Sequence, residues 1–210
     1  RAAEWRLWGA CSYKWAYLPS HIMAVIPCPM GHTCRPRRAH FATIHRLEDS
    51  IVPYNISFIS LGCAKNQVNC EQMMASVQAA GHTIQAQPEG ADVVVVNTCG
   101  FLASACEEAI ENILEMAELK KAGQVKKILV TGCMTQRYKE DIFHELPEVD
   151  GILGTGSYGD ICAAIDEVMA GSGLRPCHLG NIHTANQSGE RILSTPPWYA
   201  YLRIAEGCDN

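Results

Sequence analysis

The chain has 210 residues, of which 48% are hydrophobic and 19% charged, a composition typical of a soluble globular protein with one or two domains. Cysteine accounts for 11 of the 210 residues, a smaller share than the roughly 8–10% typical of small disulfide-stabilised scaffolds. With a net charge of -5, no secretory pattern and no apolar run of about 18 residues, the chain is predicted to be cytoplasmic, with reduced thiols and no membrane span.

The first 54 residues differ in composition from the rest. They hold seven Lys or Arg against three Asp or Glu, whereas the remainder holds ten against nineteen. They show no sustained periodicity and begin without Met, so we expect residues 1–54 to be an irregular extension of unknown role on a chain that is a fragment. Cys28, His32 and Cys34 form a CxxxHxC pattern there, for which metal binding is the weaker interpretation.

Regular patterns begin at residue 55. A strand is predicted over 56–61, followed by a helix that ends at Gly81. The apolar positions of this helix, spaced i, i+3, i+4 and i+7, are Cys70, Met73, Met74 and Val77. A short strand is predicted near 83–85. Four consecutive valines within 92–96 indicate a central strand that is buried on both faces.

The pattern continues with alternating helices and strands. Ser104 and Glu107 form a capping-box pair that opens a helix ending at Gly123. Its predicted apolar face consists of Ile110, Ile113, Leu114 and Ala117. A strand over 127–130 precedes a helix from the cap Thr135 to about residue 145.

A strand over 149–153 and a helix opened by Ser157 and Asp160 complete the pattern, and this helix ends at Gly171. Strands that alternate with helices predict an α/β fold with an open, mostly parallel sheet and flanking helices, over residues 55–171. Residues 172–197, rich in Gly, Ser, Asn and Thr, are predicted to be a linker. Residues 198–210 are predicted to be the truncated start of another domain.

Three cysteines follow three of the predicted strands, and each is next to a glycine. They are Cys63, Cys99 and Cys133, beside Gly62, Gly100 and Gly132. The carboxyl ends of parallel strands share one edge of the sheet, where ligands bind in open α/β folds, so these thiols should face one pocket. Glycine lets the backbone approach a ligand closely, and the following helix N-termini are expected to favour thiolate over thiol.

Three thiolates could hold zinc with an open fourth position, or an iron–sulfur cluster with one iron uncovered. The cysteines are 36 and 34 positions apart, unlike the close CxxC pairs of structural zinc sites, so a substrate-accessible cluster is favoured. Three other cysteines, Cys70, Cys106 and Cys162, are predicted to pack in the core. Cys177 lies in the predicted linker and is assigned no role.

A GxGxxG pattern at Gly154, Gly156 and Gly159 resembles a dinucleotide-binding fingerprint. No second strand ending in Asp or Glu follows about 20 residues later, as that fingerprint requires. We therefore interpret the pattern as a turn and helix cap, and a nicotinamide-dependent dehydrogenase is the weaker alternative.

Four motifs in order carry a resemblance to a known family: SLGCAKN at 60–66, ADVVVVNTCGF at 91–101, VTGC at 130–133 and LSTPPWYAYLRIAEGCDN at 193–210. Over residues 55–210 the chain resembles the radical S-adenosylmethionine methylthiotransferases, specifically the RimO-type branch that modifies an aspartate of a small-subunit ribosomal protein. Ala64 and Lys65 fit this branch. Asn69 and Cys70 stand where the family commonly has Asp and Ser.

The resemblance implies that Cys63, Cys99 and Cys133 bind an auxiliary 4Fe-4S cluster, whose open iron is where the sulfur to be inserted is thought to bind. It also implies that Cys208 is the first cysteine of the CxxxCxxC motif of a second 4Fe-4S cluster, which cleaves S-adenosylmethionine. The complete enzyme would add a methylthio group to the β-carbon of an aspartate in small-subunit ribosomal protein twelve, with the help of sulfur and electron donors.

Two alternatives remain open. One is a transfer-RNA adenosine methylthiotransferase, which alone would imply a nucleic-acid partner. The other is a non-catalytic iron–sulfur or metal-binding module. Because the chain ends shortly after Cys208, the polypeptide by itself is expected to be inactive.

Overall fold

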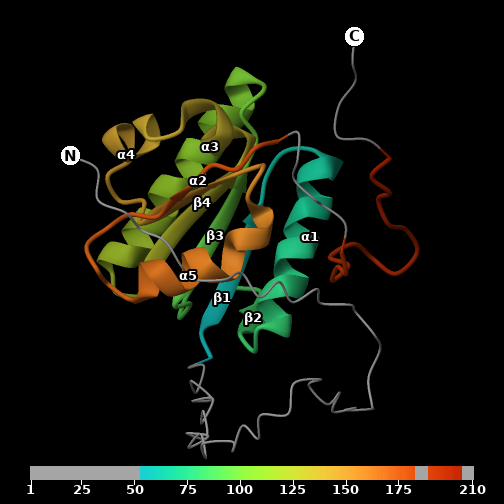
Figure 1. Cartoon of the computed structure of the whole chain (residues 1–210), viewed down its shortest axis with the longest axis horizontal. Helices are drawn as coiled ribbons and strands as arrows, with labels where there is room; N and C mark the ends of the chain where they lie inside the picture. The colour runs from blue at the N-terminus through green and yellow to red at the C-terminus, as the bar shows by residue number, and fades with distance from the viewer. Residues whose placement is uncertain (1–52, 183–188, 205–210) are drawn as a thin grey trace, which may run out of the picture. The chain divides into compact units, whose positions relative to one another are not determined.

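The computed structural model describes residues 53–182 and 189–204, which belong to one unit, Leu47–Asn210. Strands and helices alternate along this unit (Figure 1). The elements are β1 (Asn55–Ser60), α1 (Ala64–Ala79), β2 (Thr83–Gln85), β3 (Val93–Thr98), α2 (Ala103–Lys121), β4 (Lys127–Gly132), α3 (Cys133–Tyr138), α4 (Asp141–Glu145), β5 (Gly151–Gly154), the 3-10 helix η1 (Tyr158–Asp160), α5 (Ile161–Met169) and β6 (Cys177–His178).

The strands form one six-stranded, parallel sheet in the order β2-β1-β3-β4-β5-β6. The predicted fold class, an open parallel sheet with flanking helices, is confirmed. The chain steps from β1 to β2 on one side, then returns past β1 to form β3 on the other side. The direction of winding therefore reverses between β1 and β3, and ligands of open α/β sheets bind at such a switch point, outside the carboxyl ends of the strands.

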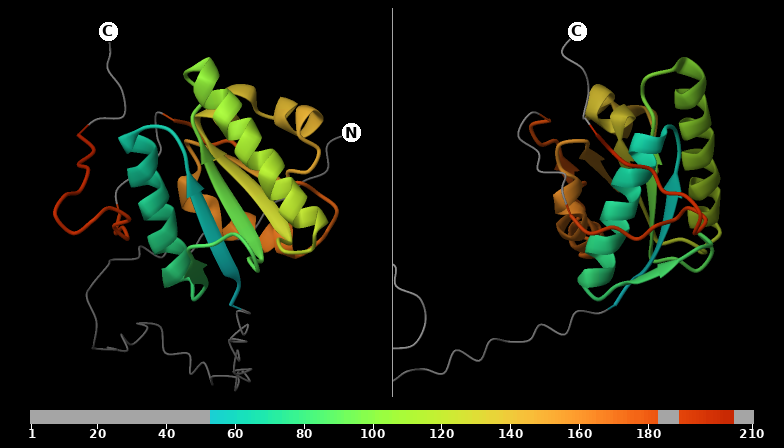
Figure 2. Two further views of the ribbon diagram at one scale, coloured as in Figure 1. Left: turned by 180° about the vertical axis from the view of Figure 1, so that it is seen from behind. Right: turned by 90° about the vertical axis from the view of Figure 1, so that its right-hand side faces the viewer.

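The core lies in two layers on either side of β3, as the four valines predict. Val93–Val96 are all fully buried. Val94 and Val96 pack in the cluster that contains Ile113 of α2, whereas Val93 and Val95 pack in the cluster that contains Met73 of α1 and Ile165 of α5. Seen from its edge, the sheet has α2 on one face and α1 and α5 on the other (Figure 2).

Helix α2 differs from its prediction in its N-cap and in the face that it buries. Its N-cap is Leu102 and no side chain caps it, so Ser104 lies inside the first turn and the capping box with Glu107 is wrong. Ile110 and Leu114 are 39% and 45% exposed. The residues that α2 buries are Ala109, Ile113, Met116 and Ala117. Ile113 and Ala117 are therefore buried as predicted, and the buried face is rotated away from Ile110 and Leu114 towards Ala109 and Met116.

The helix predicted from Thr135 to about residue 145 is two short helices. Helix α3 starts earlier, at Cys133, and Lys139 takes φ +50° between α3 and α4. The hydroxyl of Thr135 lies within hydrogen-bond distance of the carbonyl oxygens of Gly132 (2.8 Å) and Leu153, and its one proton is shared between them. Thr135 therefore ties α3 to the end of β5 rather than capping a helix.

The last βα unit also differs in detail. Ser157 makes no side-chain cap, because its Oγ accepts a hydrogen bond from the N–H of Gly180 (2.7 Å). Helix α5 begins only after η1. A sixth strand, β6, lies inside the predicted linker and pairs Cys177 with Ile152 of β5. Of the helices in the described part of the chain, none is long and apolar enough to cross a membrane.

Candidate functional site

The three Gly-flanked cysteines lie at one edge of the sheet. Strands β1, β3 and β4 are neighbours, and their register pairs Ser60 with Asn97 and Thr98 with Gly132. Cys63 is the N-cap of α1, and Cys133 is the first residue of α3. Cys99 directly follows β3. All three thiols therefore stand at the carboxyl ends of adjacent strands, and two of these strands, β1 and β3, flank the switch point.

The cysteine loops touch one another through glycine. A Cβ on Gly62 would lie 2.8 Å from the Cβ and 3.6 Å from the Sγ of Cys99, and Gly62 has φ +94°. A Cβ on Gly100 would lie 2.7 Å from the backbone nitrogen of Met134, which follows Cys133. Contacts this short leave no room for a side chain, so glycine is what allows the three loops to meet.

Asn66, in the first turn of α1, joins all three loops. It is 1% exposed, and its Nδ2 donates to the carbonyl oxygens of Leu61 (3.2 Å) and Thr98 (3.0 Å). Its Oδ1 accepts from the Sγ of Cys133 (3.7 Å), and its own carbonyl accepts from Nδ2 of Asn97 (2.7 Å). The sequence did not predict a role for Asn66, because its partners Thr98, Asn97 and Cys133 lie 31 to 67 positions away.

The thiols are within electrostatic reach of one another. Burial raises the pKa of the Cys133 thiol, nearby Lys65 opposes this, and Cys99 and Cys63 raise it further. The expected preference for thiolate is therefore not met at Cys133, because desolvation disfavours the charged form and α3, with six residues, has only a weak dipole. Lys65, like Asn66, is a neighbour of the site that sequence analysis did not assign.

A cation also braces the loop after β3. Nη1 of Arg137, in α3, donates to the carbonyl oxygen of Gly100 (3.0 Å). The guanidinium of Arg137 lies 5.4 Å from the ring centroid of Tyr138. Arg137 was not predicted to have a role, and nothing in its sequence spacing marks it.

The candidate donors at this edge are three thiols. Among residues 53–182 and 189–204, no group of three His, Cys, Asp or Glu is placed to hold one metal ion. In an iron–sulfur cluster each thiolate binds a different iron, so the ligands stand farther apart than around one ion. Three thiols with no carboxylate or imidazole among them match cluster chemistry, and the role of Cys63, Cys99 and Cys133 as ligands stays a prediction.

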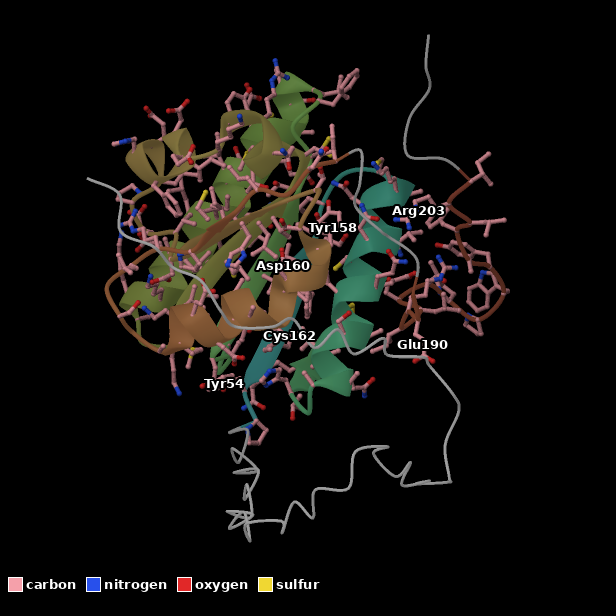
Figure 3. The ribbon with its side chains drawn as sticks, in the orientation of Figure 1. Tyr54, Tyr158, Asp160, Cys162, Glu190 and Arg203 are labelled. Atoms are coloured by element: carbon pink, nitrogen blue, oxygen red, sulfur yellow. The ribbon has the colours of Figure 1, made fainter. Side chains whose placement is uncertain are left out.

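The other cysteines divide into three environments. Cys70 is 3% exposed, as predicted, and burial raises its pKa to about 12. Cys162, on α5 (Figure 3), is only half-buried. Its Sγ donates to the carbonyl oxygen of Ser76 in α1 (3.6 Å). Cys177 is exposed.

Cys106 contacts one of the three cysteine loops of the candidate site. It is half-buried, and its Sγ donates to the carbonyl oxygen of Cys99 (3.8 Å). It lines a cavity of about 310 Å³ together with Met134 of α3 and Ile142 of α4. The core prediction for Cys106 is therefore only partly met, since the residue is half-buried and lines this cavity.

The GxGxxG edge is filled by the chain itself. A Cβ on Gly156 would lie 2.5 Å from the carbonyl carbon of Gly180, and one on Gly154 would lie 3.0 Å from a methyl group of Leu179. These glycines allow the segment after β6 to pack against β5, which agrees with the interpretation as a turn. Two other predicted sites, the Cys28, His32 and Cys34 pattern and Cys208, lie outside the described residues.

Comparison with known proteins gives one family and a consistent set of relatives. Residues 55–154 match the family described as "Uncharacterized protein family UPF0004". Proteins named "Ribosomal protein uS12 methylthiotransferase RimO" are similar to this chain: 48% identical over 157 residues in Syntrophomonas wolfei and 46% over 159 residues in Lachnoclostridium phytofermentans. Each alignment covers 74% of this chain and 35% of the relative. The chain thus spans about a third of the length of these curated relatives.

Proposed function

We propose, given that residues 55–154 of this chain form a UPF0004 domain, that the chain is the amino-terminal, cluster-binding part of a uS12 methylthiotransferase. The complete enzyme would add a methylthio group to the β-carbon of an aspartate in uS12, in the cytoplasm. Support comes from relatives with 41–48% identity that carry this name. Ala64 and Lys65, by the resemblance described above, favour uS12 over transfer RNA as substrate.

The observation that carries the proposal is the meeting of Cys63, Cys99 and Cys133 at the carboxyl edge of β1, β3 and β4. The residues present fit a 4Fe-4S cluster, because the donors are thiols and the loops that carry them are held together by Gly62 and Asn66. Three thiolates leave one of four irons without a protein ligand, and a bound cluster would there supply a position open to an external sulfur atom.

The chain's own residues would prepare this position. Asn66 holds the loops after β1 and β3 together and receives a hydrogen bond from Cys133, so it orients the thiols before any ligand arrives. Lys65 lies near enough to lower the pKa of Cys133. Its positive charge would also offset the negative charge of three thiolates gathered at one edge.

Iron and sulfide binding tests the proposal. After anaerobic reconstitution of the full 210-residue chain, we expect about four irons and four sulfides per chain. Replacing Cys63, Cys99 or Cys133 by Ala should abolish or strongly reduce this content. Cys162→Ala is the matched control, because Cys162 is also a half-buried thiol but lies between α5 and α1. Full iron content in any of the three ligand variants would contradict the assignment.

The radical half of the reaction needs groups beyond this domain. By the resemblance, S-adenosylmethionine cleavage requires three cysteines of a second cluster, of which this sequence holds only Cys208. We therefore expect that the 210-residue chain, reconstituted and supplied with S-adenosylmethionine and a reductant, releases no 5′-deoxyadenosine. Release of that product, measured by chromatography, would show that this chain is active by itself.

A further inference from the structure

Residues 189–204, which we call the strap, run beside helix α1, and the views of the chain agree on this placement (Figures 1 and 2). Ser194 donates to Oε1 of Glu71 twice, from its backbone nitrogen and from its Oγ, both at 2.9 Å. The N–H of Ile192 donates to the backbone carbonyl oxygen of Glu71 (3.1 Å). Three hydrogen bonds from the strap therefore converge on Glu71, 123 positions before Ser194 in the sequence.

Glu71 is an unusual residue to find at such a contact. It is 2% exposed, and its other oxygen, Oε2, lies 3.7 Å from Nη1 of Arg191, which also belongs to the strap. A buried carboxylate is costly unless it is paired and hydrogen-bonded. Here Arg191 and Ser194 provide both the positive charge and the donors, so the strap is what makes a charge at position 71 tolerable.

A second contact lies on the same helix, within two positions of Glu71. Nη1 of Arg203 donates to Oδ1 of Asn69 (2.6 Å) and lies 3.4 Å from Oε1 of Gln72, and Figure 3 shows Arg203 beside α1. Gln67, one turn before Glu71, donates to Oγ of Ser194 (3.0 Å). Four polar side chains on α1 therefore receive the strap at both of its ends.

We propose that Glu71 is a positioning residue that latches the strap to α1 and so fixes the place of the strap, up to Ile204, relative to this helix. Helix α1 begins directly after Cys63, and Glu71 stands about 12 Å along it, at 1.5 Å per residue. The helix that carries one thiol of the candidate site thus also holds the strap. The consequence for catalysis rests on the proposed function: the latch would hold the end of the strap at a fixed distance from the site at Cys63.

Docking of the strap can be measured without iron. In the 210-residue chain, Glu71→Ala should speed hydrogen exchange at the amide of Ser194 and tryptic cleavage after Arg191 by about 10- to 100-fold, because bonds to a charged group are lost. Glu71→Gln keeps an acceptor for Ser194 and should give an intermediate rate. Glu115→Ala, which removes an exposed carboxylate from α2, is the matched control and should leave both rates unchanged.

Variants on the strap itself keep the test decisive if Glu71→Ala unfolds the domain. Ser194→Ala and Arg191→Ala each remove one partner of Glu71 and leave the core side chains in place, so the α/β domain should stay folded with a lowered urea midpoint. Exchange at Ile192 should speed up severalfold in both variants, and so should tryptic cleavage after Arg191 in Ser194→Ala. Unchanged exchange in folded Glu71→Ala, or in both strap variants, would overturn the latch. Iron content should stay at the wild-type value in Ser194→Ala, so failure of the latch and failure of the cluster proposal are read separately.

The substitution Asn69→Asp should strengthen docking of the strap on α1. Among the described residues, Nδ2 of Asn69 has no hydrogen-bond partner although the side chain is buried. A carboxylate at this position would remove that unsatisfied donor and pair with Arg203, so cleavage after Arg203 should slow by about tenfold. A purely structural role of α1 gives no reason for this protection, and faster cleavage would contradict the proposal.

Discussion

Two neighbouring stretches of the sheet's carboxyl end are rich in glycine and have different roles: the thiol edge after β1, β3 and β4, and the β5 edge beside it. At the ends of β1, β3 and β4, glycines let three loops meet around Cys63, Cys99 and Cys133. Beyond β5, Gly154 and Gly156 let the chain pack against itself, with Leu179 and Gly180 in the space. Glycines at the end of a strand therefore indicate only that two backbone segments approach each other closely. Whether a ligand site results depends on which side chains those segments carry.

Gly132→Ala should have the largest effect on the thiol edge. Gly132 has φ +107°, and a Cβ there would lie 2.8 Å from both the Thr98 nitrogen and the Asn97 Oδ1. Strain and overpacking together should lower the free energy of unfolding by about 3 kcal/mol. Urea denaturation followed by circular dichroism measures this loss. A value within about 0.5 kcal/mol of wild type would show that the edge is looser than described.

Gly156→Ala should disturb the other edge by less. The new Cβ would meet the carbonyl carbon of Gly180 at 2.5 Å, but the segment after β6 lies at the edge of the sheet and can move outwards. We expect a loss of about 2 kcal/mol in the same urea assay. Iron content after reconstitution should stay at the wild-type value, and its loss would mean that the two edges are not independent.

Thiol labelling compares the edges in a single sample. Cys63 and Cys177 are both exposed, so in the metal-free chain both should react with iodoacetamide at about pH 8. After reconstitution Cys63 should react at least about tenfold more slowly while Cys177 keeps its rate, as peptide mass spectrometry would show. Equal rates before and after reconstitution would contradict a cluster at Cys63.

Cys70 is the internal reference for that experiment. Its folded-state pKa is raised to about 12 by burial, so near pH 8 it is protonated and should react only when the chain unfolds. The same shift makes the folded state lose stability as the pH rises from about 9 towards 12, since only the unfolded state then ionises this thiol. Urea midpoints that fall across this range, and fall less in Cys70→Ala, would check the sign.

Gly159→Ala should have the smallest effect. Gly159 is exposed in η1, and a Cβ added there would have no atom of another residue within 4 Å, its chain neighbours aside. We expect the free energy of unfolding to change by less than about 0.5 kcal/mol. Titration of this variant and the wild type with NAD should show no binding, whereas saturable binding lost in the variant would revive the dinucleotide interpretation.

The sheet could be predicted because most of its strands have simple sequence patterns. Four valines in a row indicate a strand buried on both faces, and Val93–Val96 form the centre of the sheet. Strand β6 was missed because two residues, Cys177 and His178, cannot show periodicity. The capping box at Ser104 failed because a cap depends on where the preceding loop turns, and that loop is positioned by contacts between Gly100 and Met134 that are distant in sequence.

The candidate ligands of the site could be predicted from the sequence, but the residues that hold its loops and the strap in place could not. Cys63, Cys99 and Cys133 could be grouped because parallel strands align their carboxyl ends. Asn66, Arg137 and Glu71 could not be assigned, because each acts through partners 32 to 123 positions away. Those pairings appear only when the sheet is assembled, so propensity and spacing contain no signal for them.

The wide spacing of the three cysteines also has a consequence for how this domain folds and how its folded state is stabilised. Cys63, Cys99 and Cys133 belong to three separate βα units, 36 and 34 positions apart. A ligand held by all three would close two long loops, act as a cross-link between units and stabilise the folded chain over the unfolded one. The domain can gather its ligands only after β3 has been inserted between β1 and β4, so acquisition of iron would report completed folding.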